Sequence, residues 1–92
     1  MNTQDIRIDT GLMLAMRYKK PVVLLSTVIE DYFPHLTQTT AQRMANNQQL
    51  PFAVFKTDTS SKSPWLVHVS DLAACMDKQN EAANKDWLAM HG

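Results

Sequence analysis

The side chains best suited to chemistry in this sequence are the amides, hydroxyls and single guanidinium between residues 35 and 47. Asparagine and glutamine can hydrogen-bond adenine in bidentate fashion, arginine can do the same for guanine, and threonine offers a hydroxyl and a methyl group. A polar helix face is often only solvated, which is the alternative interpretation of this segment. The side chains predicted to contact DNA are His35, Thr37, Gln38, Thr39, Gln42, Arg43, Asn46 and Asn47.

A second polar group lies in the turn-rich stretch from 57 to 63, between predicted strands at 52–56 and 65–69. Hydroxyl and ammonium groups bond phosphate oxygens, and such contacts position a protein on DNA without reading its base sequence. Turns are polar in any protein, so a merely soluble turn is the alternative here. The predicted phosphate contacts are Lys56, Ser61, Lys62 and Ser63.

Two helices joined by a short turn are needed to present the first group of side chains. Thr27 and Glu30 have the spacing of a capping box, which predicts the start of one helix. That helix should end near Phe33, because Pro34 disfavours helical geometry in the residue before it. Thr37 can then cap the next helix, which its apolar spacing predicts from 38 to 48. These signals predict a helix-turn-helix.

The sequence of the N-terminal part of the chain predicts one short helix and one short strand. Residues 1–9 are polar and are expected to be frayed. Thr10 is expected to cap a helix that stops before Pro21, and the β-branched and leucine run at 22–25 predicts a strand. The apolar stripe expected on that helix consists of Leu12, Met13 and Met16.

The hairpin strands and the C-terminal helix carry more apolar surface than a small core needs. Both strands are apolar on both faces, so the first helix or a second copy is expected to cover the outer face. Ser70 is expected to cap the last helix, with Asp71 in its first turn, and residues 84–92 are a predicted interaction tail. The predicted partner interface consists of Phe55, Trp65, Trp87 and Leu88. Packing in the core of the same chain is the alternative for each, and the better interpretation for Trp65.

Together these elements predict an α+β fold, a small winged helix-turn-helix. Its order is helix, short strand, helix-turn-helix, β-hairpin wing and C-terminal helix, within one domain over residues 1–92. A chain of this length can bury only a modest core, so help from a partner or from self-association is expected.

The net charge of 0 counts against binding to phosphate, but the charges are divided along the chain. From 33 to 69 the sequence carries Arg43, Lys56 and Lys62 against Asp58, whereas the segment from 70 to 92 is acidic. A monomer with so few cations would bind DNA weakly. The charges therefore predict a homo-oligomer on double-stranded DNA.

No catalytic residue, metal site or cofactor is predicted. The histidines share no metal-ligand spacing, the 2 glycines form no phosphate loop, and the 1 cysteine excludes an internal disulfide. Cys75 is expected to be a small core residue. The longest apolar run, 21–25, is far too short to span a membrane, so the predicted location is the cytoplasm with no membrane partner.

Five short segments of the sequence are LMLAMRY (12–18), DYFPHLT (31–37), LPF (50–52), SKS (61–63) and VHVSDLA (67–73). In their order and spacing they resemble the pyocin activator (PrtN-like) family of small prophage-associated regulators, over about residues 10–83. The resemblance implies a sequence-specific DNA-binding activator of phage-derived late or bacteriocin-type genes, with RNA polymerase as a further partner.

Two other functions fit a small winged helix. One is an excisionase-like recombination directionality factor, which bends attachment-site DNA beside an integrase. The other is a phage-encoded protein inhibitor that kept the fold and lost DNA binding, which would agree with the zero net charge and the apolar surface.

Overall fold

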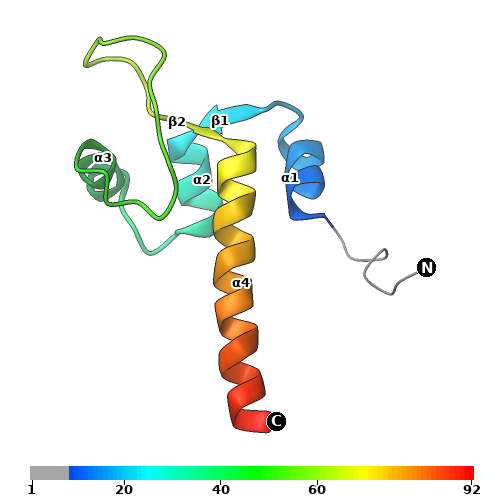
Figure 1. The fold of residues 1–92 in the computed structure, drawn as a ribbon. Helices are drawn as coiled ribbons and strands as arrows, with labels where there is room; N and C mark the ends of the chain where they lie inside the picture. Colours follow the sequence, from blue (N-terminus) through cyan, green and yellow to red (C-terminus); the bar gives the residue numbers. More distant parts are fainter. Residues whose placement is uncertain (1–8) are drawn as a thin grey trace.

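The computed structural model describes residues 9–92 and is an α+β protein, in which helices surround a small antiparallel sheet. The helices and strands gather around the N-terminal half of the last helix, whose C-terminal half extends away from them (Figure 1). The elements are α1 (Thr10–Tyr18), β1 (Val22–Leu24), α2 (Leu25–Tyr32), α3 (Gln38–Asn46), β2 (Leu66–His68) and α4 (Val69–His91). The expected fraying of residues 1–9 falls almost wholly outside the described residues.

The sheet pairs two strands that lie far apart in the sequence. β1 and β2 are antiparallel, with Val23 opposite Val67, and both of these side chains are buried. The expected hairpin is therefore wrong in its main pairing. The strand expected at 52–56 is reduced to one bridge. In it the amide of Phe55 donates to the carbonyl of Leu66 at 3.0 Å, and the carbonyl of Phe55 accepts a bond of 2.7 Å from the amide of Leu66. β1 pairs with the edge of β2 that Phe55 leaves open, because Val23 completes the apolar face of the sheet beside Val67.

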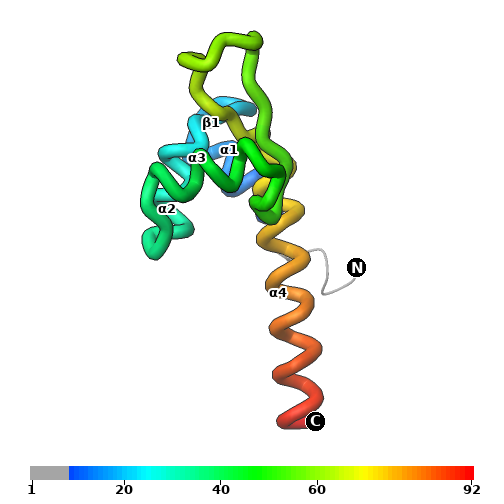
Figure 2. Tube along the Cα trace, turned by 90° about the vertical axis from the view of Figure 1, so that its left-hand side faces the viewer, coloured from blue at the N-terminus to red at the C-terminus, as the bar shows by residue number. Residues whose placement is uncertain are grey.

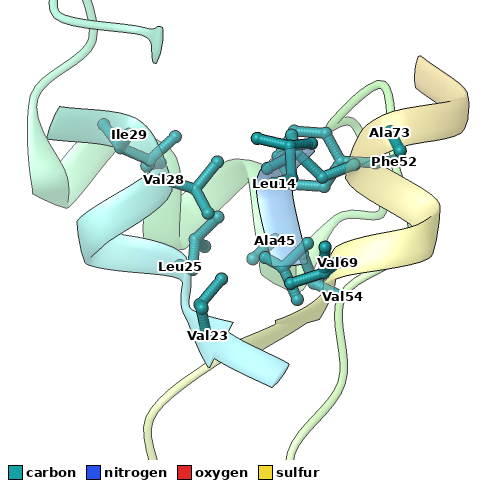
Figure 3. Close-up of a cluster of buried hydrophobic side chains, with 13 residues drawn as sticks. Leu14, Val23, Leu25, Val28, Ile29, Ala45, Phe52, Val54, Val69 and Ala73 are labelled. Atoms are coloured by element: carbon teal, nitrogen blue, oxygen red, sulfur yellow. The ribbon is translucent and has the colours of Figure 1, made fainter. Parts of the chain in front are cut away.

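The core lies between the sheet and the four described helices (Figure 3). Its largest side chains with almost no exposure come from α2, β2 and α4: Val28, Ile29, Val67 and Leu72. Phe52 and Val54 enter it from the long connection before β2, and Ala53 between them is exposed. The other buried members are Leu14, Val23, Leu25, Ala41, Ala45, Val69 and Ala73.

α1 packs through a different stripe from the expected one. Leu14 is buried and Tyr18 is half-buried against the core, whereas Leu12, Met13 and Met16 are 50–60% exposed. The reason is the close approach of α1 to α4, where a Cβ on Gly11 would lie 3.7 Å from the Cβ of Ala73. The residues at positions 11, 14 and 18 therefore share the buried face.

Two N-caps were predicted for α1 and α3, and one of them is confirmed. The hydroxyl of Thr37 accepts a hydrogen bond of 3.1 Å from the amide of Thr40 at the start of α3. α1 is capped by Asp9 and not by Thr10, since the Asp9 carboxylate accepts a bond of 2.9 Å from the amide of Leu12. The expected ends near Pro21 and Pro34 are confirmed.

The caps predicted for α2 and α4 are wrong for one shared reason. Each strand runs directly into the next helix, so the last strand residue becomes the N-cap. α2 therefore begins at Leu25, ahead of the expected Thr27, and the capping box does not form. At α4 the ring of His68 takes the place of Ser70, because its Nδ1 accepts a bond of 3.2 Å from the Ser70 amide.

A polar network joins α1 to α2. The hydroxyl of Tyr18 donates to the Asp31 carboxylate at 2.7 Å, and the guanidinium of Arg17 lies 3.2 Å from the same oxygen. These two bonds hold the pKa of the Asp31 carboxyl below its ordinary value, with the tyrosine contributing most. Burial and the bond to Asp31 raise the pKa of Tyr18.

Asp31→Asn is expected to lower stability at neutral pH and to flatten its fall in acid. Folding favours the ionised carboxylate, so its stabilisation is present above the ordinary pKa of 3.8 and is lost as the pH falls through the lower folded-state pKa. The measurement is the free energy of unfolding in urea, from about pH 7 to about pH 2. Parallel curves for the variant and the wild type would contradict this role for Asp31.

Candidate nucleic-acid interface

The orientation of α3 is set by its small residues. Ala41 and Ala45 are wholly buried against the core and Met44 is half-buried, so the opposite face of the helix is turned to solvent. α3 lies on the side of the molecule away from α1 (Figure 1). The exposed side chains of this face, including the C-cap, are Thr39, Gln42, Arg43, Asn46 and Asn47.

The turn between α2 and α3 is held to the core by aromatic contacts. Phe33 stacks on Phe52 with ring centres 5.7 Å apart, and its carbonyl accepts a bond of 2.9 Å from the amide of Leu36. The side chain of Gln38 donates to the carbonyl of Ser26 on α2 at 3.0 Å. These contacts fix α3 against α2.

The long connection between α3 and β2 extends beyond the sheet and ends in an ordered tip (Figure 1). Asp58 organises the tip, because its carboxylate accepts bonds from the amide of Ser60, at 2.8 Å, and from the hydroxyl of Ser63. The hydroxyl of Ser60 in turn accepts from the amide of Lys62 at 3.2 Å. The bonds from Ser63 and Ser60 lower the pKa of the Asp58 carboxyl, so the turn holds an ionised group.

α3 and this connection enclose a polar hollow of about 370 Å³. The Lys56 ammonium lies 4.8 Å from the centre of the Trp65 ring, a cation–π contact that anchors the lysine at the wall of the hollow. The hollow therefore brings side chains of α3 together with side chains of the connection. Its lining consists of Gln42, Asn46, Lys56, Ser61, Lys62, Ser63, Pro64 and Trp65.

The remaining predicted contacts lie outside this hollow. Thr37 is engaged as the cap of α3, and the amide of Gln38 is bound to α2. His35 is exposed in the turn, where its ring meets Phe33 edge-on at 6.2 Å. Thr39, Arg43 and Asn47 are exposed along α3 without lining the hollow.

Sequence reasoning missed the structural role of Asp58. An aspartate in a turn-rich stretch can form an Asx turn, in which its carboxylate accepts from the backbone amide two residues on, and this signal could have identified it. It also missed Pro64 as part of the lining.

The predicted partner residues divide into two places. Phe55 is 39% exposed beside the sheet, and Trp65 is half-buried under Lys56. Trp87 and Leu88 lie on the distal part of α4 and are 59% and 58% exposed. Trp87 and Leu88 are therefore not packed into the core of the same chain, whereas Trp65 packs against it, as the better interpretation expected.

Residues 9–92 contain no group of three or more His, Cys, Asp or Glu side chains that could hold a metal ion. Nor does any helix of the described chain combine the length and the apolar composition that crossing a membrane requires. Burial raises the pKa of the Cys75 thiol, and the residue packs against the core as expected.

Comparison with known proteins identifies one family. The family model described as pyocin activator protein PrtN matches residues 10–83, from the first turn of α1 into the free half of α4. The match includes α3 and the connection that closes the hollow. Neither the curated proteins nor the solved structures contain a match to the chain.

Proposed function

Since the chain belongs to the family of the pyocin activator protein PrtN, we propose that it activates transcription of prophage or bacteriocin-type genes by binding a specific double-stranded DNA sequence. The family is named for a regulatory activity and not for a catalysed reaction. RNA polymerase is the further partner that activation requires.

The order and packing of the elements support a winged helix-turn-helix. In this interpretation α2 and α3 are the two helices of the motif, and α3 enters the major groove. The connection from 56 to 65 acts as the wing, carried on the edge of the sheet by the bridge at Phe55. A wing of this kind reaches the DNA backbone beside the groove that the helix occupies.

The observation that carries the proposal is the shared hollow. Gln42 and Asn46 of α3 face Lys56 and Lys62 of the connection across one polar space. Amide groups suited to base edges therefore lie next to cations suited to phosphate, as a helix in a groove flanked by a wing requires. Arg43, exposed on the adjoining part of α3, is the guanine-reading candidate.

The charges of this surface also favour DNA. Arg43, Lys56 and Lys62 outnumber the one acidic residue of the same region, Asp58. Because the Asp58 carboxylate accepts bonds within the tip, it faces its own turn and leaves Lys62 available for an anion. The cations are nevertheless few, so the proposal expects each site on DNA to hold more than one copy.

Selection of bound sequences from a random DNA pool tests the proposal. We expect an enriched motif, which footprinting then places at a promoter. Footprints at attachment sites would favour the excisionase-like alternative. Absence of any shift against excess nonspecific competitor DNA would overturn DNA binding and favour the protein inhibitor.

Lys62→Ala is expected to weaken binding to all DNA sequences alike. A lost phosphate contact lowers the magnitude of the slope of log K against log salt by about 1. Lys85→Ala is the matched control, because it removes the same charge from the exposed distal part of α4. The slope is measured by fluorescence anisotropy over a salt series. A slope that Lys62→Ala and Lys85→Ala change equally would place Lys62 away from DNA.

A further inference from the structure

The C-terminal half of α4 is a helix without a covering layer. α4 runs for 23 residues, and every residue from 78 to 92 is exposed. Both views show this half extending away from the other elements (Figures 1 and 2). A single helical segment of this length is marginal in water, so most of its stability has to come from packing.

The apolar stripe of α4 continues into this free half with one polar position, Asn80. Ala73 and Met76 pack in or against the core, and beyond them the same face carries Ala83, Trp87 and Met90. The spacing alternates between three and four residues, which is the seam of a two-stranded coiled coil. In order, the seam positions are Val69, Ala73, Met76, Asn80, Ala83, Trp87 and Met90.

We propose that residues 79–91 of α4 pair in parallel with the same segment of a second copy of this chain. The pairing is a short two-stranded coiled coil in which Trp87 and Met90 of one copy pack against those of the other. It depends on the described helix and its sequence alone, and it holds whether or not the chain binds DNA.

Asn80 argues for a second copy of the same chain in parallel. It is the only polar residue among the described seam positions, and it occupies the first of the two alternating positions, where one asparagine commonly sets register. In a parallel pair Asn80 meets Asn80 of the other copy, and the two amides satisfy each other. An antiparallel pairing of residues 79–91 sets Asn80 opposite Met90 and leaves its amide without a partner.

The positions flanking the seam are also compatible with a parallel pair. Between parallel helices each such residue faces the one five positions further along the other copy. Gln79 then faces Asn84, and Asp86 faces His91, so no like charges meet. The one lysine of this segment, Lys85, lies outside the seam and its flanks.

The parallel orientation places both copies of α3 at the same end of the pair. If the proposed DNA binding is correct, this is the arrangement that two neighbouring half-sites require. An antiparallel pair would carry the two heads to opposite ends. The interface spans fewer than two full heptads, so we expect a dimer that dissociates at roughly micromolar concentrations.

Sedimentation equilibrium of the full chain without DNA tests the pairing. We expect monomer and dimer in concentration-dependent proportion for the wild type. Trp87→Ala should raise the dissociation constant by about tenfold or more, whereas Leu88→Ala should change it little. Leu88→Ala is the matched control, because Trp87 and Leu88 are 59% and 58% exposed and only Trp87 lies on the seam. A strictly monomeric wild type, or equal effects of the two variants, would overturn the proposal.

Disulfide cross-linking tests the orientation. In a Cys75→Ala background, Met90→Cys should give a covalent dimer on oxidation, because the two copies of position 90 meet only in a parallel pair. Glu81→Cys, off the seam, is the control and should cross-link poorly. Absence of cross-linking by Met90→Cys at concentrations where the dimer predominates, or equal cross-linking by both variants, would overturn the parallel arrangement. Both measurements omit DNA, so a result that overturns the pairing would not contradict the proposed function.

Discussion

Leu72→Ala is expected to lower the free energy of unfolding by about 2–5 kcal/mol, the largest effect of any change considered for this chain. Leu72 has no exposed surface and lies on α4 where the helices and the sheet meet. Its truncation removes buried apolar contacts and leaves a cavity that the surrounding side chains fill only in part. In so small a domain, a loss of this size is a large share of the total stability.

Urea denaturation followed by far-ultraviolet circular dichroism measures this loss. Leu88→Ala is the control, because it makes the same chemical change on the same helix at a side chain that is 58% exposed. It should cost about 0.5 kcal/mol or less when the chain is monomeric. Comparable losses for the two variants would mean that the packing of α4 against the core is wrong.

Arg43→Ala is expected to cost about 1–3 kcal/mol of binding free energy at the preferred DNA sequence and to relax preference at one position. The expectation rests on the exposed face of α3, whose direction the buried Ala41 and Ala45 fix. The measurement is competitive binding to the selected sequence and to versions changed at single positions.

Arg43→Lys separates base reading from charge. Lysine keeps the positive charge but lacks the planar fork that bonds guanine in bidentate fashion. We therefore expect this variant to retain the salt dependence of the wild type and to lose much of its discrimination. Unchanged preference in both variants, with the fold intact, would remove Arg43 from the set of base contacts.

Local signals predicted the end of α2 and the start of α3 well. Pro34 ends α2 and Thr37 caps α3, and both effects act within a few residues of the chain. The strand pairing could not be predicted from such local signals, because Val23 pairs with Val67, which lies far from it in the sequence. Once that pairing forms, the strands run directly into helices and override the local caps at Thr27 and Ser70.

Only part of the candidate site could be predicted from local signals as well. The polar face of α3 follows from helical spacing, and two of its predicted contacts, Gln42 and Asn46, line one hollow with the predicted contacts of the connection. Which side chains were already engaged could not be predicted, because the bond from Gln38 to Ser26 depends on how two helices pack. Contact of any of these side chains with DNA stays a prediction.

The pairing of β1 with β2 also has a consequence for protein synthesis. α2 and α3 leave the ribosome before β2, but as helices of 8 and 9 residues they are marginal in water until they pack. β1 has no strand partner until residues 66–68 have emerged, and Leu72 follows only then. α3 is therefore synthesised early, but the core contacts that orient it form only later. A nascent chain that ends before β2 lacks these contacts, so the polar face of α3 has no fixed direction.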